Sequence, residues 1–117
     1  MELIGHTVAD KVNAYDANID YEALAGAYTS EAMAACRQAL ELVEDAAGMP
    51  PTIDYMYQRS ACRSDAIALM FLASLNIVSL RAMGHRHAAK AIDAARAFVG
   101  ARLDATRNSD SSCVTLY

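Results

Sequence analysis

Alanine is the residue that most constrains the fold of this chain. It occupies 25 of the 117 positions, and it has the highest helix propensity of the common residues. No stretch alternates β-branched and polar residues in the manner of a half-buried strand. The sequence therefore predicts an all-α fold.

Start and stop signals define the clearest predicted helix, residues 30–47. Thr29 precedes it and is a favoured N-cap residue, apolar residues recur within it every three or four positions, and Gly48 followed by Met-Pro-Pro predicts its end. The last predicted helix covers residues 86–107, which are Ala-rich and amphipathic. Both helices are long enough to bury one face against neighbours.

Residues 53–83 predict a further long helix that begins after Thr52. An unbroken helix of this length would span roughly 45 Å, longer than the neighbours expected for it. We therefore expect a bend or break near residues 60–64, where Ser64 can cap the second part. Within it, residues 66–80 are almost entirely apolar and predict a portion buried on nearly all sides.

The N-terminal third predicts two more helices. An apolar stripe continues at helical spacing through residues 4–19, and Asp20 can cap a short helix over residues 21–28 after a jog in the chain. The expected architecture is thus an antiparallel helical bundle of four main helices plus a short helix, forming a single helical domain over residues 1–117.

Composition gives expectations about location and assembly. Residues 66–80 are shorter than the roughly 20 residues of a membrane span, and the first ten residues lack the pattern of a signal peptide, so we expect a cytoplasmic protein without membrane association. The chain has three cysteines, an odd number without metal-ligand spacing: Cys36, Cys62 and Cys113. We expect them to be reduced residues that contribute to packing. Because 55% of the chain is hydrophobic, we also expect a homodimer that hides the excess.

Charge divides unevenly along the chain. Residues 1–58 hold ten acidic side chains against two basic ones, whereas the remainder holds eight basic side chains against four acidic ones. The basic residues are spread along helices rather than clustered, so we interpret the asymmetry as attraction across the fold or across a dimer. Nucleic-acid binding is not expected.

Two polar residues interrupt predicted apolar faces and are candidates for a ligand pocket. Asn76 lies within the apolar run, and Arg102 falls on the inward side predicted for the last helix. Tyr55 and Tyr57 could form walls of such a pocket, because ligand sites are mostly apolar with a few convergent polar groups. The alternative is that Asn76 specifies the helix register and that Arg102 pairs with an acid from the N-terminal half or from a second subunit.

The segment "RAMGHRHAAK", residues 81–90, holds the candidate catalytic residues Arg81, His85 and His87. An Arg followed after a few residues by a His at the start of a helix resembles the HEPN family of ribonucleases. The resemblance implies metal-independent RNA cleavage, with the His as general acid or base and the Arg stabilising phosphate charge. The alternative is a helix elbow, in which Gly84 ends one helix and the basic residues meet carbonyls at the helix end.

A second group of polar residues, Glu41, Glu44 and Asp45, shares one helix face. An ExxE pair of this kind is similar to half of the magnesium site of MazG-like nucleotide pyrophosphohydrolases. The matching ExxD half is missing, which favours a solvated acidic face. We expect no metal site and no cofactor.

The function that fits these patterns is a non-enzymatic binding or regulatory module. Its partner would be a protein or a small, mostly apolar ligand held between helices. A HEPN-like ribonuclease or a MazG-like nucleotide hydrolase is the alternative.

Overall fold

The computed structural model describes residues 19–115 and the side chains of residues 19–110. Within residues 19–115, three long α-helices follow one another, and a single 3-10 turn, η1, precedes the second of them. Their bounds are α2 Tyr21–Gly48, η1 Ile53–Tyr55, α3 Met56–Ala82 and α4 Arg86–Thr115. The described residues contain no strand, so the all-α prediction is confirmed.

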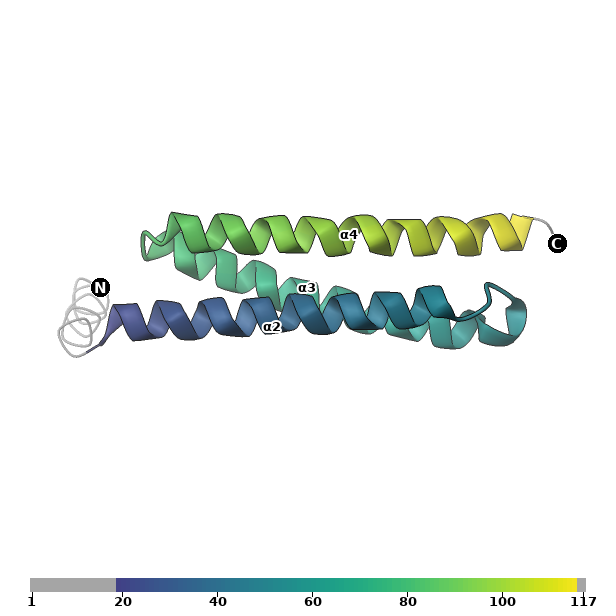
Figure 1. Ribbon diagram of the computed structural model, residues 1–117, viewed down its shortest axis with the longest axis horizontal. Coiled ribbons are helices and arrows are strands. Elements are labelled where there is room, and N and C mark those ends of the chain that lie inside the picture. Colours follow the sequence, from purple (N-terminus) through teal and green to yellow (C-terminus); the bar gives the residue numbers. More distant parts are fainter. Residues whose placement is uncertain (1–18, 116–117) are drawn as a thin grey trace, which may run out of the picture.

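The helices form a three-helix arrangement in which α2 and α4 run in the same direction and α3 runs antiparallel to both (Figure 1). A bundle of four main helices plus a short helix is not found in the part of the chain that the structure describes. The short helix expected over residues 21–28 and the helix expected over 30–47 are one continuous helix, α2. The helix expected over residues 4–19 lies outside the described residues except for its last position.

The start of α2 shows why the two expected helices are one. Asp20 is the N-cap, as predicted: its backbone is extended, and its carboxylate accepts a hydrogen bond of 3.1 Å from the backbone N–H of Ala23. Thr29 was expected to cap the second helix, and this is wrong. Thr29 lies inside α2, where its hydroxyl donates a hydrogen bond of 2.7 Å to the carbonyl of Ala25. The side chain is therefore hydrogen-bonded within a helix and does not cap one.

The end of α2 falls within one residue of the predicted end, and one of the two predicted signals accounts for it. Gly48 was expected just past the helix; it is instead the last helical residue, and its φ is not positive. Met49 follows with φ −85° and ψ 144°. Because the ring of Pro50 clashes with a helical residue before it, the extended conformation of Met49 ends the helix.

The predicted break in the next helix is absent. α3 is continuous through residues 60–64, and Ser64 caps nothing. The break was expected because an unbroken helix over residues 53–83 would be longer than the neighbours expected for it. With 27 residues, α3 is instead close in length to α2, with 28 residues, and to α4, with 30 residues, so helices of similar length cover one another.

Gly84 makes the turn between α3 and α4. Its φ is +83°, the only positive φ among the described residues. The N–H of Gly84 donates to the carbonyl of Arg81 at 3.0 Å, and the N–H of His85 donates to the carbonyl of Leu80 at 2.8 Å. This pair of bonds is a Schellman motif, so the prediction that Gly84 ends the helix is confirmed.

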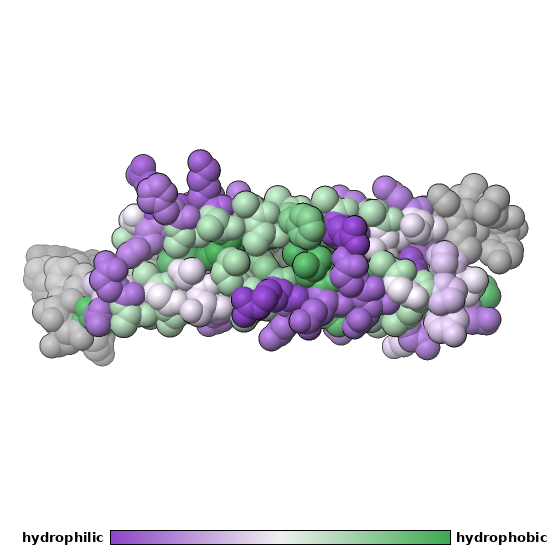
Figure 2. All heavy atoms as spheres, viewed as in Figure 1, coloured by the Kyte–Doolittle hydropathy of each residue, from purple (hydrophilic) through white to green (hydrophobic). Residues whose placement is uncertain are grey.

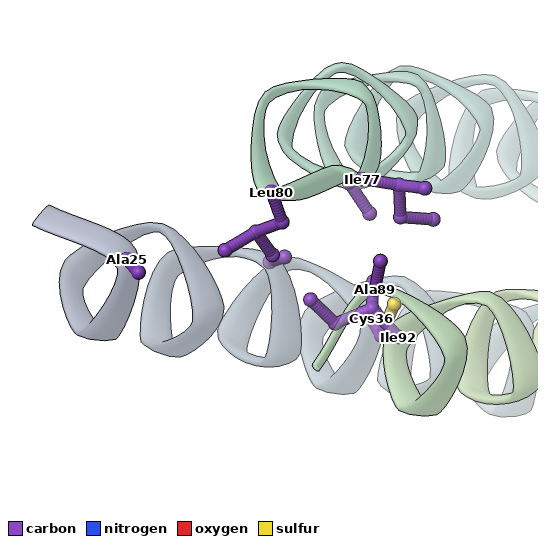
Figure 3. Packing of buried hydrophobic residues seen from close by; sticks show 8 residues of the cluster. Ala25, Cys36, Ile77, Leu80, Ala89 and Ile92 are labelled. Carbon is purple, nitrogen blue, oxygen red and sulfur yellow. The ribbon is translucent and has the colours of Figure 1, made fainter. Parts of the chain in front are cut away.

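The core is a narrow seam lined largely by alanine. Four alanines of α2, spaced seven residues apart, are at most 4% exposed; they are Ala25, Ala32, Ala39 and Ala46. Near the Gly84 turn, the core cluster adds Ile77 and Leu80 of α3 and Ile92 of α4 (Figure 3). Side chains this small let helix backbones approach closely, and a seven-residue repeat keeps one face of each helix on its neighbours.

The arrangement is long and thin, and it leaves one face of α3 uncovered. The radius of gyration is 19.5 Å, against about 13 Å for a compact domain of roughly 100 residues. The expectation that residues 66–80 are buried on nearly all sides is wrong: Phe71, Leu75 and Val78 are 66%, 52% and 64% exposed. Two neighbouring helices can cover only one side of α3.

Candidate functional site

The four residues predicted to form a ligand pocket do not come together. Tyr55 and Tyr57, where α3 begins, are 41% and 83% exposed. Asn76 is buried further along α3, and its amide donates to the carbonyl of Tyr28 at 3.1 Å. Asn76 therefore ties α3 to α2 at one level, which is the register role considered as the alternative to a pocket.

Arg102 lies on the rim of the helix pair rather than inside it. Its side chain is 47% exposed, so its predicted inward orientation is wrong. Its guanidinium donates two hydrogen bonds, of 3.0 and 2.6 Å, to the carboxylate of Glu44 on α2, which confirms the predicted pairing with an acid of the N-terminal half. Arg102 also borders a cavity of about 270 Å³, whose lining residues are Val43, Ala47, Pro51, Arg59, Arg102, Ala105, Thr106 and Ser109.

The candidate catalytic residues surround the Gly84 turn. Arg81 is exposed in the last turn of α3, and His87 is exposed in the first turn of α4. His85 is the residue before α4: its carbonyl accepts the first helical hydrogen bond, from Ala89, and its Nε2 lies 3.9 Å from Glu22 Oε1. A surface groove of about 400 Å³ is lined by Arg81, Arg86, Lys90 and Asp93.

The acidic group on α2 is a surface feature. Glu41, Glu44 and Asp45 are all exposed, and Glu44 is held by Arg102. Among residues 19–110 there is no cluster of three or more His, Cys, Asp or Glu side chains that could hold a metal ion.

A buried ion network, which the sequence analysis did not identify, joins all three helices. Arg59 of α3 is 2% exposed, and its Nε donates to Asp110 of α4 at 2.7 Å. The same guanidinium donates to the carbonyls of Ala46 and Met49 at the end of α2, the latter at 2.5 Å, while Arg63 also binds Asp110. Arg59 therefore supplies a positive charge to the C-terminus of α2, which has no basic residue in its own last turn.

A sequence signal for Arg59 does exist. Arg59, Ala66, Ala73 and Leu80 are spaced seven residues apart, and all four are buried. Arg59 thus occupies a core position of the α3 repeat, and a charged residue at such a position needs a buried partner. In α4, Leu103 and Asp110 lie on the equivalent repeat.

One thiol has a shifted acidity. Burial raises the pKa of Cys36 above its usual value, and the positive charge of Arg96 opposes the shift. Cys36 packs in the core cluster near the Gly84 turn, and Cys62 is partly buried with a free thiol. The thiol of Cys36 therefore stays protonated to higher pH than an exposed cysteine.

The face formed by α2 and α4 carries a small apolar groove. Figure 2 shows this face, with apolar residues gathered at its middle and charged residues beside them. The groove encloses about 180 Å³ and is lined by Met33, Cys36, Arg37, Leu40, Ala95, Phe98 and Val99. Sites for drug-sized ligands enclose roughly 300 Å³ or more, so this groove is small for one.

The most extensive candidate site is the uncovered side of α3, which we name the α3 stripe. Its residues recur every three or four positions and every one is exposed; they are Ile53 of the preceding turn η1, followed in α3 by Tyr57, Ser60, Ser64, Ile67, Phe71, Leu75, Val78 and Ala82. The stripe lies opposite the buried residues of α3. A groove of about 390 Å³ between α3 and α4 borders it and shares Ile67 and Phe71 with it.

The two apolar faces explain the hydropathy of this helix. By length and composition the segment Ile53–Ala82 could cross a membrane, and 28% of its most apolar window is buried within the protein. Membrane spans and helices with protein on both sides share this composition. The two cases differ in whether lipid or protein contacts the α3 stripe.

Comparisons of the chain with protein-family models, with curated proteins and with solved structures found no match.

Proposed function

We propose that this protein is a non-enzymatic interaction module that binds an amphipathic helix of a protein partner along the α3 stripe. The observation that carries the proposal is the second apolar face of α3. Ile53, Tyr57 and Phe71 expose 81%, 83% and 66% of their surfaces on it. Large apolar side chains gathered on one exposed face are typical of sites that bind another protein.

The shape of the stripe favours a helix as the bound element. Its residues follow the spacing by which one helix presents side chains to another, and helix-in-groove recognition uses anchors at this spacing. The groove beside it owes its depth to small residues of α4, Ala97 and Gly100. A partner side chain can enter this groove while the partner helix lies along α3.

A long partner also fits the stripe better than a small molecule does. The stripe extends over residues 53–82, roughly 45 Å of helix, and it has no enclosed centre. Small-ligand sites are concave and bury most of the ligand. A helix with apolar residues along one side is the occupant that matches this length.

The test is binding of a labelled synthetic amphipathic helix with leucine at every third or fourth position, followed by fluorescence anisotropy. Wild-type protein is expected to bind it at micromolar concentration. Replacing Phe71 and Leu75 together by Ser removes two anchors, each worth about 1.5–3 kcal/mol when fully buried, so affinity should fall more than tenfold.

The matched control is Phe98→Ser, which removes an equally large exposed side chain from α4, 57% exposed, in the groove between α2 and α4. It should leave affinity within about twofold, a difference too small for a lost anchor. An equal loss in both variants contradicts the proposal, and so does the absence of binding by a wild type that is monomeric at the concentration of the assay. Circular dichroism of each variant confirms that the helices are retained.

A further inference from the structure

We infer that the helix bound by the α3 stripe is α3 of a second copy of this chain, packed antiparallel with residue 53 of one copy level with residue 82 of the other. The inference rests on the proposed function, since it names the partner of the same face. The stripe is self-complementary in this register in the size of its side chains. A homodimer with one two-fold axis is the simplest assembly that uses one patch twice.

Size complementarity is clearest in the middle of the stripe. Ser60 and Ser64 are its small residues, and Phe71 and Leu75 are large ones. In the antiparallel register, Ser60 lies level with Leu75 of the second copy, and Ser64 lies level with Phe71. Each large side chain therefore faces a small one, which lets the two helices approach closely without voids.

The residues at the ends of the stripe also have partners in this register. Ile53 lies level with Ala82 of the second copy, and Tyr57 lies level with Val78. The two-fold axis then passes between the levels of Ile67 and Ala68. The whole length of the stripe is used, and no large residue of either copy is left facing solvent beyond the end of the other helix.

Two other arrangements lose this fit. Shifting the antiparallel pair by seven residues sets Phe71 on Phe71 and Ile67 on Leu75, which opposes large residues, and it leaves Ile53 and Tyr57 uncovered. A parallel pair sets Phe71 on Phe71 and Ser60 on Ser60, which crowds one level and leaves a void at another. The antiparallel pair with residue 53 level with residue 82 packs better than either, and it covers the full length of both stripes.

The stripe carries no charge that would oppose this pairing. None of the nine stripe positions carries a charged residue, so two copies can meet without desolvating an ion.

The experiment is disulfide cross-linking of single-cysteine variants, in a chain whose Cys36, Cys62 and Cys113 are replaced by Ala, Ala and Ser. Ile67→Cys lies next to the two-fold axis, so mild oxidation should convert most of it to a covalent dimer. Ser60→Cys is the matched control: in the antiparallel pair it lies about 22 Å from its counterpart, beyond the reach of a disulfide. It should stay at single-chain mass.

Mixing Ser60→Cys with Leu75→Cys should restore the cross-link, because these positions lie level in the antiparallel pair. Rapid cross-linking of Ser60→Cys with itself would indicate a parallel pair and overturn the inference. Light scattering of the wild type gives an independent measurement, with twice the chain mass expected at micromolar concentration. The Phe71→Ser, Leu75→Ser double variant should return to the mass of one chain.

Two further outcomes overturn the inference and separate it from the proposed function. A monomeric wild type that binds the synthetic helix refutes the second copy and leaves the proposed function standing. A monomeric wild type that does not bind the helix but floats with phosphatidylcholine–phosphatidylglycerol vesicles refutes both, because the stripe then faces lipid.

Discussion

Arg59 and Arg102 are the same residue type in two environments, and their side chains serve different purposes. Arg59 is 2% exposed and satisfies groups from α2 and α4, whereas the Arg102 side chain is 47% exposed and pairs with Glu44 at the surface. Removing one partner of a buried ion pair leaves an uncompensated charge, while exposed pairs are weak. The two arginines therefore form a matched pair for mutation.

Arg59→Leu should lower the free energy of unfolding by about 3–5 kcal/mol, because it leaves the Asp110 carboxylate and the last carbonyls of α2 without their buried donor. Arg102→Leu should lower it by less than about 1 kcal/mol. Urea denaturation followed by circular dichroism measures both. Equal losses would show that the network does not hold the helix ends together.

The raised pKa of Cys36 predicts a stability loss at alkaline pH. The unfolded thiol ionises near its usual pKa, about 8.5, while the folded thiol stays protonated to higher pH because it is buried. The contribution of the protonated thiol is complete below the unfolded pKa and is lost as pH rises through the folded one.

The measurement compares unfolding free energies from about pH 7 to pH 10, on either side of the usual thiol pKa. The wild type should lose more stability over this range than Cys36→Ala does. Cys62→Ala is the control and should follow the wild type, since it keeps the buried thiol of Cys36. Parallel curves for the wild type and Cys36→Ala would refute it.

Residue-level predictions from the sequence succeed where the reason is local. Asn76 is buried as its place in an apolar run predicts, and Arg102 meets an acid of the oppositely charged half. The role of Arg59 could not be predicted in the same way. Its carboxylate partner, Asp110, lies 51 residues away in the sequence, and its carbonyl acceptors become available only where α2 ends beside α3.

At the scale of elements, Gly84 is the one glycine with a left-handed backbone among residues 19–115. Gly84→Ala should lower the free energy of unfolding by about 1 kcal/mol or more, because an L side chain is strained at φ +83° even where nothing lies near its Cβ. Gly26→Ala is the control. Gly26 is inside α2 with open space at its Cβ, so alanine should stabilise there by about 0.5–1 kcal/mol.

These two variants are compared by thermal and urea denaturation. Opposite signs are expected, and destabilisation of similar size in both would show that the α3–α4 turn does not depend on a positive φ. The α3–α4 helix boundary itself was predictable, since the Schellman turn depends on one residue type at one place.

Element lengths were less predictable than element ends. Thr29 and Ser64 are residues that can cap a helix, and both lie in helix interiors here. A residue that can cap a helix ends it only if leaving the helix lowers the free energy of the chain more than continuing the helix does. With neighbours of matching length, continued helix keeps burying its apolar face, and this tertiary gain is absent from the local sequence.

At the scale of the whole molecule, dimerisation through the α3 stripe predicts that stability depends on protein concentration. Only folded chains can dimerise through the stripe. Dimerisation therefore shifts the folding equilibrium toward the folded state by mass action. The Tm of the wild type should rise as protein concentration is raised from about 1 to 100 μM, a range that brackets ordinary micromolar affinities.

The Phe71→Ser, Leu75→Ser double variant should show a Tm independent of concentration. Scanning calorimetry at three concentrations gives both results. A wild-type Tm that does not move over this range would contradict assembly through the stripe. Phe98→Ser serves again as the control and should retain the concentration dependence.

The uncovered face of α3 was beyond prediction from the sequence for a physical reason. Hydropathy depends on the residues of a helix and not on what lies beside the helix. An apolar run therefore predicts burial on all sides, whether its second face contacts protein, lipid or water. The number of covering helices depends on how the long elements pack. Their packing sets α2 and α4 on one side of α3 and leaves Phe71 and Leu75 exposed on the other.

The alanine seam has a consequence for how this protein can change by mutation. In most small proteins the interior tolerates exchange among large apolar residues, and polar substitutions there are the damaging ones. Here Ala32, Ala39 and Ala73 leave no exposed surface at all, and each added methylene would push two backbones apart. At these three sites, selection should remove valine or leucine as strongly as it removes a charged residue. The sites can therefore change only to glycine or serine.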